Sequence, residues 1–135
     1  MKPQSDKPTI AIDFDGVIHA YTSQWVHAGV IADDAVPGFW EWADTVCKFY
    51  RLVIFSSRCD NEKAIDAMRR WLIEQRTKWR KEGGKTDGTA HFEFATRKPS
   101  AHVLIDDRAI QFRGRWDAPE LSLEAIRNFK PWNKQ

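Results

Sequence analysis

The sequence predicts an α/β domain with a three-layer α/β/α arrangement, in which helices cover both faces of a mainly parallel sheet. Three observations support this fold class. The chain has 135 residues, enough for a single hydrophobic core. Of these residues, 42% are hydrophobic and 30% are charged, as in ordinary globular proteins. Short apolar runs also alternate with amphipathic segments along the chain, which is typical of α/β domains.

We expect residues 9–135 to form a single domain and residues 1–8 to form a flexible leader, because the leader shows no hydrophobic periodicity. The first strand is predicted at residues 9–12, a short β-branched run followed by polar residues. Residues 17–36 lack helical spacing, so they are expected to form a loop or short hairpin, which we call the flap. Whether the flap closes over a site stays open.

A proline and a glycine open a predicted helix over residues 37–49, whose apolar residues recur on one face. A second strand is predicted at residues 51–55, and the longest helix at residues 60–81, with Ser57 and Asp60 as its capping box. The remaining elements are two predicted strands and a closing helix, at residues 91–95, 101–105 and 121–129. The order β-α-β-α-β-β-α favours a mainly parallel sheet.

The composition excludes several classes of protein. No apolar run approaches the roughly 20 residues needed to cross a bilayer, and the first residues lack the apolar core of a secretory signal. We therefore expect a cytoplasmic protein with no membrane partner. Cys47 and Cys59 are too few for a disulfide framework and lack zinc-ligand spacing, so both are expected to be reduced thiols.

Polar side chains follow three of the predicted strands. Asp13 and Asp15 follow the first strand, Ser56 follows the second, and Asp106 and Asp107 follow the fourth. Because open α/β sheets bind ligands at the carboxyl ends of their strands, these side chains should converge at one edge. Converging carboxylates repel one another and need cations. Hard oxygen ligands without a thiolate or histidine cluster favour Mg²⁺ as the cofactor.

The ordered set Asp13-x-Asp15-Gly16, Ser56, Lys98 and Ile105-Asp106-Asp107 resembles the four motifs of the haloacid dehalogenase (HAD) superfamily of aspartate-nucleophile phosphatases and phosphotransferases. The resemblance spans about residues 9–112 and implies a Rossmann-like, HAD-like core. Only about 20 residues separate Gly16 from Pro37, and residues 57–91 hold one predicted helix and a loop. Neither usual insertion point holds a cap domain, so the resemblance implies a capless core with an open site.

The resemblance also implies chemical roles. Asp13 would attack phosphorus and form an aspartyl-phosphate, while Asp15 would protonate the leaving alcohol and later activate the hydrolytic water. Ser56 would hydrogen-bond the phosphoryl oxygens, and Lys98 would neutralise their charge. Gly16 would allow backbone amides to approach the phosphate.

The expected cofactor of such an enzyme is Mg²⁺. Its ligands would be Asp13, Asp106 and the backbone carbonyl of Asp15. Asp107 would hold a metal-bound water or Lys98 rather than the metal itself.

We therefore expect a Mg²⁺-dependent phosphomonoester hydrolase that acts on a small phosphorylated substrate, with nucleotide or nucleic-acid-end phosphates as the first choice. A sugar-phosphate phosphatase or a phosphotransferase is the alternative within this class. From another class, a receiver-like phosphoacceptor without turnover stays open, although a receiver places its acidic pair before the phosphoacceptor and this chain places Asp106 and Asp107 last. The oligomeric state is left open.

A nucleic-acid-binding module without turnover is the other alternative. It depends on a run of basic residues between Arg69 and Lys85, which a solvated helix face explains more simply. Three further residues, His19, Arg58 and Arg108, lie near the predicted site and are open to either a substrate-binding or a structural interpretation.

Overall fold

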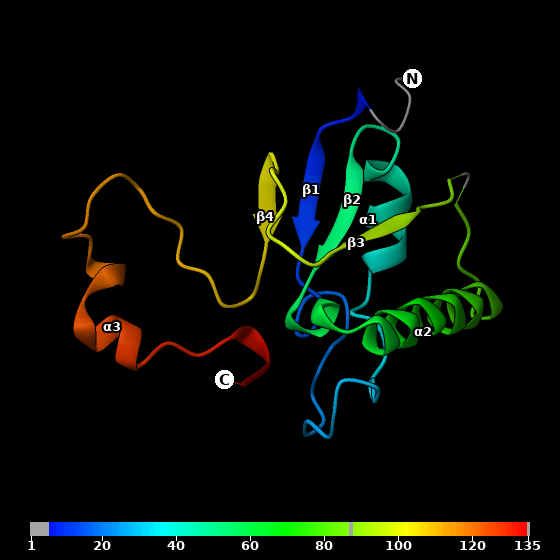
Figure 1. The fold of residues 1–135 in the computed structure, drawn as a ribbon, viewed down its shortest axis with the longest axis horizontal. Coiled ribbons are helices and arrows are strands. Elements are labelled where there is room, and N and C mark those ends of the chain that lie inside the picture. The colour runs from blue at the N-terminus through cyan, green and yellow to red at the C-terminus, as the bar shows by residue number, and fades with distance from the viewer. Residues whose placement is uncertain (1–5, 87, 135) are drawn as a thin grey trace.

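Four parallel strands form one sheet in the order β3-β2-β1-β4 in the computed structural model, which describes residues 6–86 and 88–134 (Figure 1). The strands are β1 (Thr9–Ile12), β2 (Arg51–Phe55), β3 (Phe92–Ala95) and β4 (Val103–Ile105). The predicted α/β class with a parallel sheet is thereby confirmed. Each strand lies within its predicted range, because contiguous apolar and β-branched residues define it.

The helices are α1 (Phe39–Val46), α2 (Glu62–Lys81) and α3 (Leu123–Arg127), with short 3-10 turns η2 (Ser57–Asp60), η3 (Pro119–Leu121) and η4 (Trp132–Lys134). Helix α1 begins later than predicted, because Gly38 adopts a left-handed φ of 89° as its N-cap. The predicted capping box of α2 is wrong. Asn61 caps this helix instead, and its side-chain oxygen accepts hydrogen bonds from the backbone N–H groups of Lys63 and Ala64.

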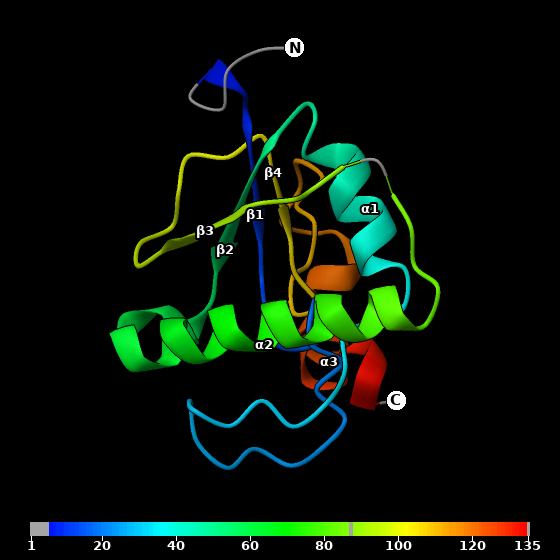
Figure 2. The same ribbon diagram turned by 90° about the vertical axis from the view of Figure 1, so that its right-hand side faces the viewer.

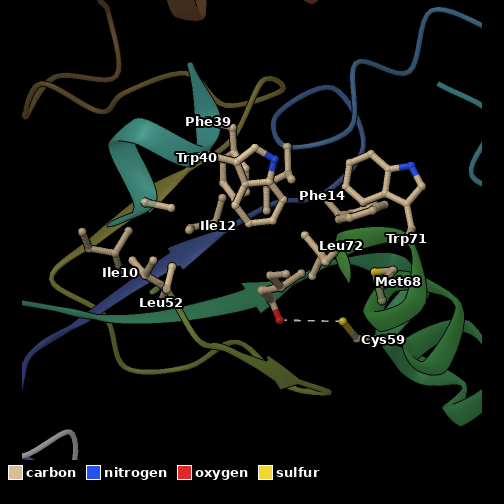
Figure 3. Packing of buried hydrophobic residues seen from close by; sticks show 14 residues of the cluster. Ile10, Ile12, Phe14, Phe39, Trp40, Leu52, Cys59, Met68, Trp71 and Leu72 are labelled. Atoms are coloured by element: carbon tan, nitrogen blue, oxygen red, sulfur yellow. Dashed lines mark hydrogen bonds between the residues drawn. The ribbon is translucent and has the colours of Figure 1, made fainter. Parts of the chain in front are cut away.

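The core lies between one face of the sheet and the helices α1 and α2. Alternate residues of the two central strands point to this face, as the period of a strand requires. They pack with Phe39 and Trp40 of α1 and with Met68, Trp71 and Leu72 of α2 (Figure 3). Both helices therefore cover the same face of the sheet (Figure 2). Burying each such side chain stabilises the fold by about 1.5–3 kcal/mol.

The part of the chain after β3 is less regular. The connection from β3 to β4 contains no helix. After β4 the chain runs beyond the edge of the sheet to α3 and then returns, so that η4 lies near the flap (Figure 1). Among the described residues, no helix has the length and apolar character needed to span a bilayer.

The amino-terminal end of the fold includes part of the expected leader. Residues 1–5 of that leader lie outside the described residues. Lys7 donates a hydrogen bond from Nζ to the Cys47 carbonyl (3.1 Å), and the Pro8 carbonyl accepts one from the backbone N–H of Arg51 (2.8 Å). Residues 7 and 8 are thus attached to the domain.

The flap contains no helix or strand, as predicted, but it is fastened to the domain. It begins with a single turn in which the Phe14 carbonyl accepts hydrogen bonds from the N–H groups of Ile18 and His19 (3.0 Å each). Its far end is joined to α2, because the Trp71 indole donates to the Asp33 carbonyl (3.0 Å) and Gln75 accepts from the Ala35 N–H (3.1 Å). The flap therefore has a defined position beside the carboxyl ends of the strands.

Candidate active site

The register of the central strands brings the predicted aspartates together. Ile12 of β1 pairs with Ile105 of β4, so the residues that follow them, Asp13 and Asp106, leave the sheet side by side. The backbone N–H of Asp13 extends this pairing by donating to the Ile105 carbonyl (2.9 Å). Two motifs about 90 residues apart in the sequence thus meet at one edge of the sheet.

The carboxylates of Asp13, Asp106 and Asp107 form a compact cluster, which we call the aspartate cluster. One oxygen of each lies within 4.8 Å of the others. The Asp107 Oδ1 atom is buried and has no hydrogen-bond partner. Within residues 6–86 and 88–134, no lysine, arginine or histidine forms an ion pair with the cluster.

The pKa values of two carboxylates in the cluster, Asp13 and Asp107, are raised above their usual range. The pKa of Asp13 is raised to about 7: burial is the largest cause, the charges of Asp106 and Asp107 add to it, and a hydrogen bond from the Phe14 N–H opposes it. Burial and the charge of Asp106 likewise raise the pKa of Asp107. A divalent cation would relieve this repulsion. The donor set consists only of carboxylate oxygens, which fits Mg²⁺.

Gly16 lies against the cluster and supports its geometry. Its φ of 80° is left-handed, and a Cβ atom at this position would collide with the Asp107 carboxylate. Glycine is therefore required here by conformation and by space together. This close approach to Asp107 is the role that the structure shows for Gly16, and its predicted role toward phosphate stays a prediction.

Replacing Gly16 with alanine is expected to displace Asp107 and weaken Mg²⁺ binding. The matched control is Gly114→Ala, because Gly114 has a similar φ of 91° with nothing within 4 Å of the added Cβ. Both variants carry the backbone strain of roughly 1–2 kcal/mol, but only the first adds a collision. Isothermal titration with MgCl₂ compares them, and equal Mg²⁺ affinities in the two variants would contradict the role assigned to Gly16.

The side chain of Asp15 lies in a different environment from the cluster. Its Oδ1 atom accepts hydrogen bonds from His19 Nδ1 (2.8 Å) and an Arg58 terminal nitrogen (3.1 Å), and its Oδ2 atom accepts from Arg58 Nε (2.8 Å). Burial alone would raise the pKa of Asp15, but these hydrogen bonds outweigh it and lower the pKa below its usual value. Asp15 is therefore held as an ionised carboxylate.

His19 is a fixed part of this arrangement. The residue is 2% exposed, and its Nε2 atom accepts a hydrogen bond from the backbone N–H of Asp33 (3.0 Å). A nitrogen that accepts cannot carry the proton, so the ring proton resides on Nδ1 and points at Asp15. The structure thus gives His19 an internal partner on each side of its ring.

Arg58 joins Asp15 to the flap. It is 2% exposed and donates to the carbonyls of Ala28 (2.7 Å) and Val30 (3.2 Å). Its guanidinium group also lies over the Trp25 ring, 4.6 Å from the centroid. The sequence left Arg58 undecided, and its position directly after Ser56 and Ser57 was the only signal that placed it near the site.

Ser56 and Lys98 leave neighbouring strands at the same edge of the sheet. Ser56 follows β2, and its hydroxyl accepts a hydrogen bond from the backbone N–H of Arg58 (3.2 Å) as the cap of η2. Lys98 follows β3 by three residues and is exposed. Among the described residues, no hydrogen bond or ion pair involves Lys98, so its ammonium group is not paired with a carboxylate of the cluster.

The basic run on α2 is partly used inside the protein. Arg76 forms a buried ion pair with Asp44 (2.7 Å), and Lys78 pairs with Asp34 of the flap (2.7 Å). Arg69 lies over the Phe94 ring, 5.0 Å from the centroid. These contacts reduce the charge that the run offers to a phosphate backbone, and favour the interpretation as a helix face.

Two hollows lie close to this edge. One, of about 270 Å³, has an apolar lining that includes Ile12 and Ile105, directly behind the cluster. The other, of about 610 Å³, lies between the flap and α2 and includes Asp34 and Lys78. Neither of these two hollows is lined by a residue of the aspartate cluster, whose three residues are each only partly buried.

Comparison with family models, with curated proteins and with solved structures found no match for this chain.

Proposed function

We propose that this protein is a Mg²⁺-dependent phosphomonoester hydrolase that works through an aspartyl-phosphate on Asp13. The observation that carries the proposal is the aspartate cluster, in which one oxygen from each of three carboxylates at the ends of two adjacent strands lies within 4.8 Å of the others. Among the described residues, no lysine, arginine or histidine forms an ion pair with these carboxylates. Such crowding is unfavourable unless the site holds a cation when it works. Phosphoryl transfer is the proposed reaction because Asp13-x-Asp15, Ser56, Lys98 and Asp106-Asp107 follow one another in the order of the HAD motifs.

Asp13, Asp106 and the backbone carbonyl of Asp15 would hold Mg²⁺ in this proposal, and Asp107 lies close enough to hold the ion or one of its waters. When bound, Mg²⁺ neutralises charge on the phosphoryl group and on the carboxylates around it. The raised pKa of Asp13 explains why this matters, because Asp13 must be ionised to act as a nucleophile.

In the first step, one oxygen of Asp13 forms a bond to phosphorus while the bond from phosphorus to the leaving oxygen breaks. In the second step, water attacks the same phosphorus, inorganic phosphate leaves and the Asp13 carboxylate is restored. Ser56 and Lys98 follow neighbouring strands and would bind the phosphoryl oxygens during both steps. Lys98 must approach from its exposed position for this role.

Asp15 is assigned the proton transfers. As an ionised group held by Arg58 and His19, it is ready to accept the proton of the attacking water in the second step. In the first step it must acquire a proton before it can give one to a leaving alkoxide. Leaving groups that depart without a proton avoid this requirement, so an aryl phosphate is the most suitable first substrate.

The proposed substrates are small phosphorylated compounds. Nucleotides and nucleic-acid-end phosphates are the first choice, and sugar phosphates are the alternative. The partial exposure of the three cluster residues agrees with a HAD-like core that carries no cap domain. The proposal includes the Rossmann-like topology of that core, while its second layer of helices stays a prediction.

The test is hydrolysis of 4-nitrophenyl phosphate by the purified protein with MgCl₂ and with EDTA. We expect turnover that requires Mg²⁺ and is lost with EDTA. Nucleotides, sugar phosphates and a 5′-phosphorylated oligonucleotide are then compared by release of inorganic phosphate. Absence of phosphate release from every substrate with Mg²⁺, Mn²⁺ or Co²⁺ would contradict the proposal.

A further inference from the structure

The C-terminal turn η4 touches the loop that carries the nucleophile. The Trp132 indole N–H donates a hydrogen bond to the Gly16 carbonyl (2.6 Å), across 116 positions of sequence. Asn133 donates from Nδ2 to the carbonyls of Ala20 and Tyr21 (3.1 Å each). Trp132 and Asn133 thus hold three backbone carbonyls, one directly before the flap and two near its start.

These contacts fall on backbone that is otherwise strained or crowded. Gly16 has a left-handed φ of 80° and lies against the Asp107 carboxylate. Tyr21 is the one described residue other than glycine with a positive φ, of 55°. A left-handed φ in a residue that has a Cβ, such as Tyr21, persists only where the surroundings hold it. The Lys134 ammonium group, 5.3 Å from the centroid of the Tyr21 ring, adds a further contact to this part of the flap.

We infer that Trp132 is a positioning residue of the active site. Through Trp132, η4 completes the site by fixing the peptide group of Gly16, which follows Asp15 in the chain and lies against the Asp107 carboxylate. The inference rests on the function proposed above and adds a site component that the sequence motifs do not contain. The Gly16 carbonyl belongs to the residue directly after Asp15, and the Gly16 Cα packs against Asp107. Movement of this peptide therefore shifts two of the acidic groups together.

The test is Trp132→Phe, which removes the indole N–H and keeps an aromatic ring. The matched control is Trp116→Phe, because Trp116 lies in the same C-terminal part of the chain, is 81% exposed and packs its ring against Phe112. We expect Trp132→Phe to lower kcat on 4-nitrophenyl phosphate roughly 3- to 10-fold, the equivalent of one hydrogen bond, with KM nearly unchanged. The control should retain wild-type kcat.

Two measurements do not depend on activity. Trp132→Phe should weaken Mg²⁺ binding in isothermal titration, and it should speed amide hydrogen exchange in residues 14–21, while the melting temperature stays close to that of the control. Wild-type Mg²⁺ affinity and exchange in Trp132→Phe, or equal losses in the control, would overturn the inference. If the wild-type protein hydrolyses no phosphate ester, the proposed function fails, and the exchange and Mg²⁺ measurements still decide whether η4 holds this loop.

Discussion

Asp13→Asn is expected to abolish Mg²⁺-dependent hydrolysis, with a fall in kcat of at least about 10³-fold, because the amide cannot attack phosphorus. The amide oxygen can still accept the hydrogen bond that Asp13 receives from the Phe14 N–H (2.8 Å). The fold should therefore be preserved. Initial rates with 4-nitrophenyl phosphate measure the loss. Asp117→Asn serves as the control for removing an exposed carboxylate that is paired with Arg115.

The same variant makes a prediction about stability that separates a lost nucleophile from a damaged fold. The pKa of Asp13 is raised to about 7 in the folded protein. In the absence of metal, the free energy of unfolding therefore falls as the pH rises from the pKa of Asp13 in the unfolded chain to its pKa in the folded protein, because ionisation of Asp13 disfavours the folded state. The amide in Asp13→Asn carries no such charge. In EDTA at about pH 8, the variant should melt at the same temperature as the wild type or higher. A lower melting temperature would mean that the loss of activity reflects unfolding.

The largest expected loss of stability comes from Asp44→Ala. Asp44 is 1% exposed and accepts two hydrogen bonds from Arg76 (2.7 and 3.0 Å), one from Thr86 and one from the Ala90 N–H (2.9 Å). It thereby joins α1, α2 and the segment before β3. Removing one partner of a buried ion pair leaves the other charge uncompensated, which costs about 3–5 kcal/mol. Chemical denaturation with urea measures the difference.

The control is Asp66→Ala, which removes an exposed partner of Arg69 (3.5 Å, with side chains 65% and 57% exposed) and should leave the free energy of unfolding nearly unchanged. The pair at Asp44 also predicts a pH dependence. Burial opposes ionisation of Asp44, but hydrogen bonds from Arg76, Thr86 and Ala90 lower its pKa. Its stabilisation is therefore complete above the unfolded pKa of about 3.9 and is lost as the pH falls through the folded value. Equal stability of the two variants at neutral pH would contradict the role of this pair.

The strands and the aspartate cluster could be predicted from the sequence because both follow from local patterns. Short apolar runs identify strands without knowledge of their partners, and parallel strands place the residues after them at one edge. Asp13 and Asp106 meet for this reason. The start of α1 was missed because a left-handed Gly38 ends the possible helix, and the cap of α2 was missed because Ser57 and Asp60 form a separate 3-10 turn.

The contacts that hold the site together could not be predicted, because each joins polar residues far apart in the sequence. Arg58 reaches Asp15 across 43 positions, and Arg76 reaches Asp44 across 32. In a sequence, a buried arginine looks the same as one on a solvated helix face. Arg76 lies inside the basic run, where the pattern gives no sign of its partner. The pairing depends on the packing of the flap and of α2, which no local pattern encodes.

These distant contacts also alter the chemical interpretation of the motif. Asp13 and Asp15 lie only two positions apart, but the structure places their carboxylates in different environments. Burial and the neighbouring carboxylates raise the pKa of Asp13, and the hydrogen bonds from His19 and Arg58 outweigh burial and lower that of Asp15. Two acidic groups whose environments differ in this way suit different tasks, which agrees with a nucleophile that needs a metal and a base that does not.

The central claim, a phosphoryl group carried on Asp13, is tested most directly by trapping it. The protein is mixed with 4-nitrophenyl phosphate and MgCl₂, quenched in acid within the first turnover, digested and analysed by mass spectrometry. We predict that the peptide containing Asp13 gains the mass of one phosphoryl group, and that this gain is absent with EDTA and in Asp13→Asn. Hydrolysis that proceeds with no phosphorylated Asp13 peptide at any quench time, or with the phosphoryl group on another residue, would contradict the account.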